Sequence, residues 1–312
     1  MKIYHYQRND RQPNFGDELN QWLWPKLLPD CFGPECPKDD DTHIFIGTGT
    51  LLNSRLPQRI QAAKHVSFIG TGAGYEQPLQ KIPKHWQIYC VRGPLSAQQL
   101  HLSAGKAVTD GGILVNRIFT KLQPKHYAAS FIPHIHHANY AASLWKSACS
   151  NANIHYIDPR WPVETVLADI DQSQLLLAEA MHGAIIADAL RVPWIPLITS
   201  PRILSFKWQD WCQSIALTYQ PQFVPPLSSY PRWGKGVRSG IAASQHWWCA
   251  LQQSTVNTLQ HTFQSRANLT SKRLNTIIST VKPNLSHSDV FSARLDQLEH
   301  HLEVFKIQHS KG

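Results

Sequence analysis

Apolar residues form a nearly continuous run, LLLAEAMHGAIIADALRVPWIPL, in which Glu179 and His182 stand near the middle. Charged residues and prolines interrupt the run, which argues against a membrane span. The pattern divides it into four predicted elements: a strand over 175–178, a turn over 179–181, a helix over 182–190 and a strand over 194–197. The two polar side chains then lie at the rim of the core, where a strand ends and a helix begins, instead of inside it.

The same order of apolar run, glycine turn and helix recurs through the first 120 residues. HIFIGTGTLL (43–52) and HVSFIGTGAGY (65–75) share FIGTG, and WQIYCVRGPLSAQQL leads from a predicted strand into a helix. KAVTDGGILV contains a further predicted strand that ends at Asp110. Strands that alternate with glycine turns and helices predict parallel βα units. The FIGTG turns lack the residues of a phosphate-binding loop and of a dinucleotide-binding fingerprint.

A second set of such units begins near ASFIPHIHHANY, in which PHIHH places His134 and His136 on one face of a predicted strand. ANIHYIDP predicts the next strand and PVETVLADI the helix after it. We therefore expect an α/β protein with two Rossmann-like, doubly wound domains that face a cleft, followed by a helical C-terminal tail. The predicted domains are an N-terminal one over 1–124, a C-terminal one over 125–236 and the tail over 237–312.

The tail contains an apolar stripe at helical spacing, formed by Phe291, Leu295, Leu298, Leu302 and Phe305. Such a stripe is typical of a helix that packs on its own protein, and the alternative is a short coiled-coil dimer.

Charge and composition narrow the class of partner. The formal net charge is +9, and between Pro201 and Lys282 the only acidic residue is Asp210. A basic segment favours anionic partners such as phosphorylated substrates or anionic lipid, and the absence of nucleic-acid-binding motifs argues against nucleic acid. The first residues, MKIYHYQRND, lack the apolar stretch of a signal peptide, and the six cysteines form no metal-binding pattern. We expect a cytoplasmic protein with a peripheral contact at the inner face of the membrane.

Ligands of open parallel sheets bind beyond the carboxyl ends of the strands, where Glu179, His182 and Arg92 are predicted to lie. Backbone N–H groups at the start of the helix that carries His182 favour an anion, although His182 could instead cap that helix. Arg92 follows the predicted strand QIYCV, where it can bind a carboxylate or phosphate or make a surface ion pair.

Three further stretches supply candidate substrate contacts. Asp110 lies between a predicted strand and two glycines, which would let a ligand approach closely. PNFGDELN can begin a helix with Asn14 or Asp17 as its cap, and its Gly16 would admit a substrate near the backbone. His134 is a candidate contact as well, with a purely structural role as the alternative.

These motifs occur in an order that resembles the polysaccharide pyruvyl transferase family, especially its succinoglycan-type branch. The resemblance covers roughly Asn14 to Trp211 through NFGDELN, the two FIGTG strands, VRGPLS, TDGGIL, FIPH, AMHGAIIADALRVPW and KWQDW. It implies a two-domain fold like that of GT-B glycosyltransferases. It also implies phosphoenolpyruvate as the co-substrate that donates pyruvate, a sugar of an exopolysaccharide or its lipid-linked precursor as acceptor, and a cyclic pyruvate ketal as product. No metal or redox cofactor is implied.

The resemblance assigns roles to several residues. The family's donor-site arginine matches Arg92, and its essential histidine matches His182. Many members have an arginine two residues before that histidine, where this chain has Ala180, and Arg202 and Lys207 are the candidates for the missing cation. We expect His182 to contact the phosphate or protonate the donor. The hydroxyl proton would pass to either of two acids, Glu179 and Asp17.

Two other functions are compatible with the sequence. One is a GT-B glycosyltransferase that uses a nucleotide sugar, and the other is a non-catalytic glycan-binding relative. The loss of arginine at Ala180 favours the second, whereas the presence of Arg92, Asp110 and His182 together argues against it. The basic segment suits a lipid-diphosphate-linked oligosaccharide as acceptor.

Overall fold

The computed structural model describes residues 1–33, 41–122, 124–200, 203–225, 227 and 263–309. The chain divides into two compact units. Unit 1 comprises Met1–Thr120, Phe206–Thr218 and Ser286–Gly312, and unit 2 comprises Lys121–Ser205 and Tyr219–Leu285. The first division lies within a few residues of the predicted boundary. The predicted tail, however, is divided: Ser286–Gly312 belongs to unit 1, and the part before it belongs to unit 2. Phe206–Thr218, which was predicted to lie in the C-terminal domain, belongs to unit 1.

Unit 1 contains a parallel sheet in the order β1 (Lys2–Ile3), β2 (His43–Ile46), β4 (His65–Ile69) and β6 (Trp86–Cys90), with a separate pair β3 (Thr50–Leu52) and β5 (Gly72–Ala73). Its helices are α1 (Phe15–Leu27), α2 (Pro29–Phe32), α3 (Leu56–Arg59), α4 (Pro94–Gln99), α5 (Val115–Ile118), α9 (Ser205–Ser214) and α12 (Ser288–His309), and its 3-10 turns are η1 (Ala104–Lys106) and η2 (Gly111–Leu114). Among the described strands the order runs in one direction, without the reversal of a doubly wound sheet.

The predicted strand that ends at Asp110 was wrong. Ala107 forms only an isolated bridge with Val91, and the chain then enters the 3-10 turn η2. The Asp110 carboxylate accepts a hydrogen bond from the Gly112 N–H at 2.9 Å and so caps that turn. A side chain that satisfies the local backbone in this way favours a turn over a strand.

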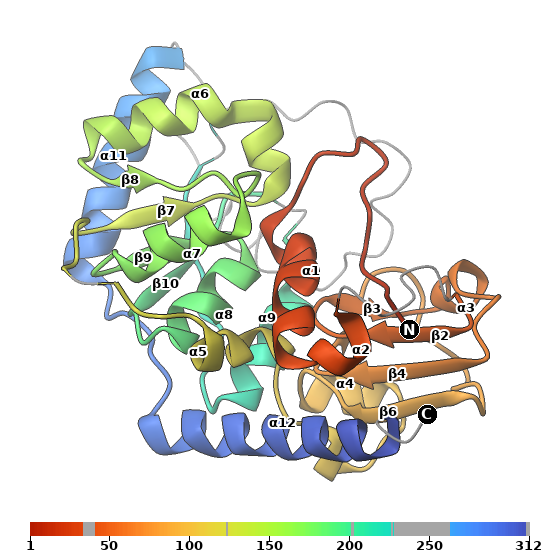
Figure 1. The fold of residues 1–312 in the computed structure, drawn as a ribbon. Helices are drawn as coiled ribbons and strands as arrows, with labels where there is room; N and C mark the ends of the chain where they lie inside the picture. Colours follow the sequence, from red (N-terminus) through yellow and green to blue (C-terminus); the bar gives the residue numbers. More distant parts are fainter. Residues whose placement is uncertain (34–40, 123, 201–202, 226, 228–262, 310–312) are drawn as a thin grey trace. The chain divides into compact units, whose positions relative to one another are not determined.

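Strand alternation sends the apolar residues of β2 to both faces of the unit 1 sheet. Ile44 and Ile46 join a core cluster on one face. Phe45 packs on the other face, with ring centroids 4.9 Å from Trp24 and 5.3 Å from Phe305. Figure 1 shows α12 running along the strands β4 and β6, which it contacts. All five residues of its apolar stripe are buried, which confirms that the stripe packs on its own protein.

Unit 2 contains a five-stranded parallel sheet in the order β11 (Gln222–Phe223), β10 (Trp194–Ile198), β9 (Leu176–Ala178), β7 (Ser130–Ile132) and β8 (His155–Tyr156). Its helices are α6 (Ile135–Asn151), α7 (Val163–Asp171), α8 (Met181–Ala189) and α11 (Phe263–Thr280). The chain moves outward from β7 to β8 and then returns to the other side of β7. This reversal confirms the doubly wound prediction for unit 2 and places its switch point between β7 and β9.

The strand, turn, helix and strand expected between residues 175 and 197 are all present, each within two residues of its predicted bounds. The strand predicted for His134 and His136 was wrong, because β7 ends at Ile132 and His134 is the N-cap of α6. Pro133 separates the two elements, and a proline has no N–H to continue a sheet ladder.

One core cluster of unit 2 joins the sheet to two helices. Phe131 and Leu177 of the sheet pack with Trp145 of α6 and Leu274 of α11, and Figure 1 shows α6 and α11 lying side by side. Among the described helices none is both long enough and apolar enough to cross a membrane.

Candidate active site

Glu179 stands at the end of β9, at the switch point of unit 2, and its side chain is fully buried. Its Oε2 accepts a hydrogen bond from the His134 N–H at 2.8 Å and lies 2.6 Å from His137 Nδ1. Its Oε1 accepts a hydrogen bond from the Thr199 hydroxyl. Thr199 follows β10 and His134 follows β7, so the carboxylate ties together the carboxyl ends of three neighbouring strands.

The electrostatics of Glu179 differ from those of a free proton acceptor. Burial by itself would raise the pKa of Glu179. The charge and hydrogen bond of His137, together with hydrogen bonds from Thr199 and the His134 N–H, outweigh burial and lower that pKa. A carboxylate that is enclosed and stabilised in its ionised form is a weak base. This geometry favours a positioning role for Glu179.

His137 was missed by the sequence analysis, which singled out His134 and His136. It is 2% exposed, and its Nδ1 also lies 2.8 Å from the Thr199 hydroxyl. The HIHH run signals a histidine cluster, but only the start of α6 decides which ring faces the sheet. His134 itself is partly exposed, and its Nδ1 accepts a hydrogen bond from the His136 N–H at 3.4 Å.

His182 lies in the first turn of α8 and is partly exposed. Ala180 occupies the N-cap position in an extended conformation, with no capping hydrogen bond from a side chain. His182 is therefore not the cap of this helix, which was the alternative left open by the sequence. The first turn of α8 follows β9 directly, so His182 stands at the edge of the sheet where ligands of this topology bind.

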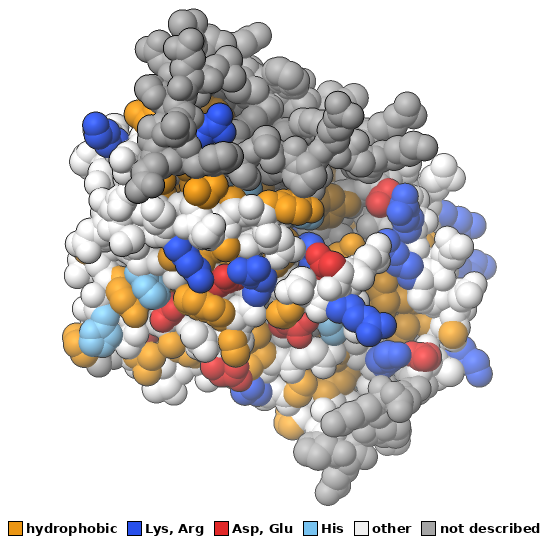
Figure 2. Space-filling model, turned by 90° about the horizontal axis from the view of Figure 1, so that it is seen from above, with side chains coloured by type: hydrophobic (Ala, Val, Ile, Leu, Met, Phe, Trp, Pro, Cys, Tyr) orange, Lys and Arg blue, Asp and Glu red, His pale blue; other side chains and the backbone are white. Residues whose placement is uncertain are grey.

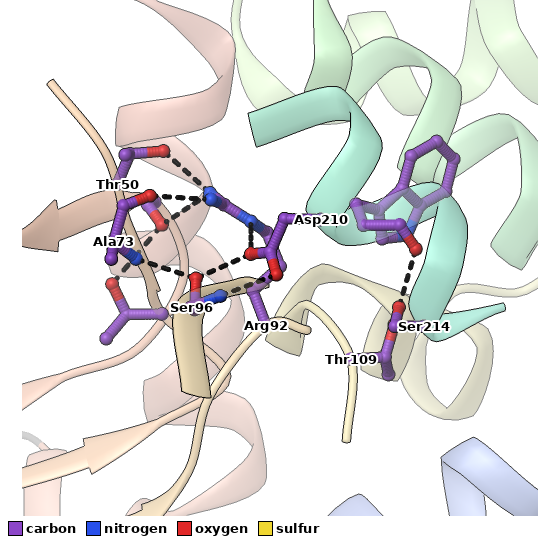
Figure 3. Close-up of polar contacts among 10 residues, drawn as sticks. Thr50, Ala73, Arg92, Ser96, Thr109, Asp210 and Ser214 are labelled. Carbon is purple, nitrogen blue, oxygen red and sulfur yellow. Dashed lines mark hydrogen bonds and ion pairs between the residues drawn. The ribbon is translucent and has the colours of Figure 1, made fainter. Parts of the chain in front are cut away.

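The corresponding edge of unit 1 contains a buried ion pair between Arg92 and Asp210, both 0% exposed (Figure 3). Arg92 Nε donates to the Asp210 carboxylate at 2.9 Å, Nη1 to the Thr50 hydroxyl at 2.7 Å and Nη2 to the Ala73 carbonyl at 2.9 Å. Asp210 also accepts hydrogen bonds from the N–H and the hydroxyl of Ser96 at 2.9 Å and 2.5 Å. The pair joins α9 to residues that follow β6 and to the β3–β5 pair.

The surface ion pair considered for Arg92 is thus replaced by an enclosed one, in which protein groups of unit 1 occupy every guanidinium nitrogen. Two glycines make room for it. A Cβ on Gly72 would lie 2.3 Å from Arg92 Cζ, and one on Gly93 would lie 2.1 Å from the Asp210 carbonyl oxygen. Arg92 therefore acts on this edge by holding it together. The sequence contained a signal for the partner of Arg92, because Asp210 is the only acidic residue between Pro201 and Lys282.

Asp17 stands in the first turn of α1, partly exposed, and accepts a hydrogen bond from Asn14 Nδ2 at 2.7 Å. Asn14 occupies the N-cap position, yet its side chain makes no capping bond to the backbone. Burial raises the pKa of Asp17 to about 6, against the opposing effects of the Asn14 hydrogen bond and of the charges of Lys207 and Arg8. Gly16, beside Asp17, is buried within the same turn.

Lys207 brings a positive charge to the same edge. It is 9% exposed, and its Nζ donates a hydrogen bond to the Tyr75 phenol oxygen at 3.0 Å. Its charge opposes the rise that burial causes in the pKa values of Asp17 and Asp110. Asp110 is fully buried, and burial raises its pKa to about 6 although Arg92 opposes the shift. Arg202, the other candidate cation, lies outside the described residues.

The predicted site residues therefore form two groups. Unit 1 contains Asn14, Gly16, Asp17, Arg92, Asp110 and Lys207, and unit 2 contains His134, Glu179 and His182. The sequence model of the polysaccharide pyruvyl transferase family matches residues 3–201.

The chain belongs to the polysaccharide pyruvyl transferase family. It is similar to the succinoglycan biosynthesis protein ExoV of Rhizobium meliloti (strain 1021), with 41% identity over 241 residues that cover 76% of this chain and 72% of that protein. These findings confirm the predicted family and the predicted class of enzyme, a pyruvyl transferase. Lys207 and Asp210 of this pyruvyl transferase lie just beyond the residues that the family model matches.

Proposed function

We propose that this pyruvyl transferase moves pyruvate from phosphoenolpyruvate to two hydroxyls of one sugar in an exopolysaccharide or its lipid-linked precursor, with a cyclic ketal as product. The observation that supports this most is that the charge of a nearly enclosed ammonium, Lys207, acts on a partly exposed carboxylate, Asp17, in unit 1. Phosphoenolpyruvate carries a carboxylate and a phosphate, which cations and backbone N–H groups bind. The GT-B-like arrangement of two domains that the resemblance implies is part of this proposal.

The chemistry requires an acid and a base. Protonation of C3 of phosphoenolpyruvate makes C2 electrophilic, a sugar hydroxyl adds to C2, and its proton passes to a base. The C2–O bond to phosphate then breaks, and the second hydroxyl adds to C2 and closes the ketal, while its proton returns to the group that protonated C3. We assign the base to Asp17, because a carboxylate with a pKa near 6 is ionised at neutral pH yet more basic than an ordinary aspartate. These steps move protons, form two C–O bonds at C2 and break one, without a net oxidation or reduction, and we assign neither a redox cofactor nor a metal.

His182 remains the candidate that protonates C3 or contacts the phosphate. The two roles differ in their response to His182→Ala. A variant that still binds phosphoenolpyruvate but has lost turnover supports proton transfer, and a variant that has lost binding supports phosphate contact. Full activity of His182→Ala contradicts both roles. Of the two candidates for the cation that many members of the family carry two residues before this histidine, we assign the role to Lys207, since Arg202 lies outside the described residues.

Thermal unfolding with phosphoenolpyruvate, and separately with UDP- and GDP-sugars, tests the donor. A ligand at about 100 times its dissociation constant stabilises the native state by roughly 2.7 kcal/mol. We expect stabilisation by phosphoenolpyruvate that Lys207→Met loses and that Lys64→Met, a change of an exposed lysine in the same unit, retains. Stabilisation by a nucleotide sugar alone would instead identify a glycosyltransferase. No shift with either donor would favour a glycan-binding protein.

The lipid-diphosphate-linked acceptor and a peripheral membrane contact are the finer parts of this proposal, and they depend on the basic segment. Within its described part, Lys207 is nearly enclosed, whereas Lys272 and Lys282 are exposed. Figure 2 shows one face on which Lys and Arg side chains stand singly or in small groups, with acidic and hydrophobic side chains among them. Co-sedimentation with vesicles of anionic lipid at low salt tests the contact, and a protein that stays in the supernatant there contradicts it.

A further inference from the structure

The loop after β5 in unit 1 has an unusual backbone. Gly74, Tyr75 and Glu76 all have positive φ angles, of 124°, 51° and 50°. Two successive non-glycine residues in the left-handed region are uncommon, and a bulky aromatic residue is a clear outlier there. Such conformations persist only where the surroundings enforce them, and they cluster at functional sites. An ion pair of 3.1 Å joins Arg55 Nη2 to Glu76 Oε2 at the surface of this loop.

The side chain of Tyr75 is exposed in spite of this conformational cost. It is 37% exposed, whereas most large apolar side chains of the described residues are buried. Its phenol oxygen accepts the hydrogen bond from Lys207, whose Nζ lies 5.4 Å from the ring centroid. The phenol oxygen is engaged by Lys207 as an acceptor, which leaves the O–H as a donor and the exposed part of the ring as an apolar surface for a ligand.

The neighbours of this ring match the chemistry of a sugar. A pyranose has an apolar face of C–H groups and a rim of hydroxyls, so it is recognised by an aromatic ring with charged hydrogen-bonding groups beside it. Lys207 donates a hydrogen bond to Tyr75, so an ammonium lies beside the ring, and the charge of the same ammonium acts on the Asp17 carboxylate. Gly or Asn would suit the backbone of this position better than a tyrosine.

We infer that Tyr75 is the platform for the acceptor sugar, with its ring against the C–H face of the pyranose and Asp17 and Lys207 toward the hydroxyls. This inference rests on the proposed function, since it assumes that Asp17 receives the proton of the acceptor hydroxyl. It identifies the ligand of this edge as a saccharide and assigns a specificity-determining contact to a loop of unit 1.

Saturation-transfer NMR tests the platform with methyl β-galactopyranoside, methyl β-glucopyranoside and methyl α-mannopyranoside, each in the presence of phosphoenolpyruvate. We expect transfer to the C–H protons of at least one glycoside in the wild type and in Tyr75→Phe, which keeps the ring. We expect about a tenfold loss in Tyr75→Leu and Tyr75→Asn, which lack it. The matched control is Tyr140→Leu, a change of a 49% exposed tyrosine in unit 2, which should leave the transfer unchanged.

Asparagine is favoured at positive φ, so Tyr75→Asn should melt no lower than the wild type, which separates lost binding from lost folding. Full transfer in Tyr75→Leu, or no transfer from any glycoside to the wild type, overturns the platform. In either case stabilisation of the wild type by phosphoenolpyruvate would leave the proposed donor intact. Absence of that stabilisation would refute the proposed function itself.

Discussion

Removal of the Asp210 carboxylate should destabilise unit 1 more than any other loss of a single ion pair among its described residues. In Asp210→Ala the Arg92 guanidinium stays buried without its counter-ion, and the N–H and hydroxyl of Ser96 lose their acceptor. Breaking a buried pair from one side costs about 3–5 kcal/mol, because the remaining charge is not solvated. That loss is a large fraction of the 5–15 kcal/mol by which domains are typically stable.

Urea unfolding of the wild type and of Asp210→Ala measures this loss in the free energy of unfolding. The matched control is Glu299→Ala, which breaks the Arg117–Glu299 pair of the same unit, whose side chains are 42% and 38% exposed. Solvent screens that pair, so the control should lose no more than about 1 kcal/mol. The double variant Arg92→Met with Asp210→Leu should recover the part of the loss that comes from the uncompensated charge, but not the part that comes from the Ser96 donors.

A loss below about 1 kcal/mol in Asp210→Ala would refute the enclosed ion pair, since that is the value of an exposed pair. A double variant as unstable as the single one would refute the reasoning about the uncompensated charge. Lys207 lies three residues before Asp210 on α9, so the single variant should also weaken the stabilisation by phosphoenolpyruvate.

Three further predictions concern single residues. Asp17→Asn should abolish turnover yet raise stability above pH 6 by about 1–3 kcal/mol. The pKa of Asp17 is raised from 3.8 to about 6 in the native state, so the wild type loses stability as pH rises through that window and the variant does not. Melting curves between pH 4 and pH 8 check this, and parallel curves would contradict it. Glu179→Gln should destabilise the protein at neutral pH and have little effect in acid. The pKa of Glu179 is lowered in the native state, so its carboxylate contributes stability that is lost as pH falls. Equal melting temperatures of the variant and the wild type at pH 7 would be inconsistent with this. Gly72→Ala should cost more than about 1 kcal/mol, since the new Cβ would overlap the Arg92 guanidinium; a neutral effect in urea would mean that the guanidinium can move aside.

Two strands predicted by the sequence analysis were wrong, because a helix or a turn forms at those residues instead. HIHH has residue types compatible with a strand, but Pro133 ends the ladder and His134 then begins α6. VTDGG likewise continues an apolar run, yet Asp110 bonds back to the Gly112 N–H and turns the chain. In both cases one residue with a special hydrogen-bonding property decided against the hydrophobic pattern. The long apolar run around Glu179 had no such competitor, and its elements were predicted within two residues.

The sequence by itself determined the α/β class, the strand ends at which polar residues gather, the apolar stripe of α12 and the family, because periodicity and motif order are properties of neighbouring residues. Only the tertiary structure decided what those polar residues meet. Arg92 pairs with an aspartate 118 positions away because the chain returns to unit 1 between Phe206 and Thr218. That return encloses Arg92. Burial raises the pKa of Asp17, whereas the contacts of Glu179 with His137, Thr199 and the His134 N–H outweigh burial and lower its pKa. Desolvation depends on everything packed around a group, and no local pattern encodes those surroundings.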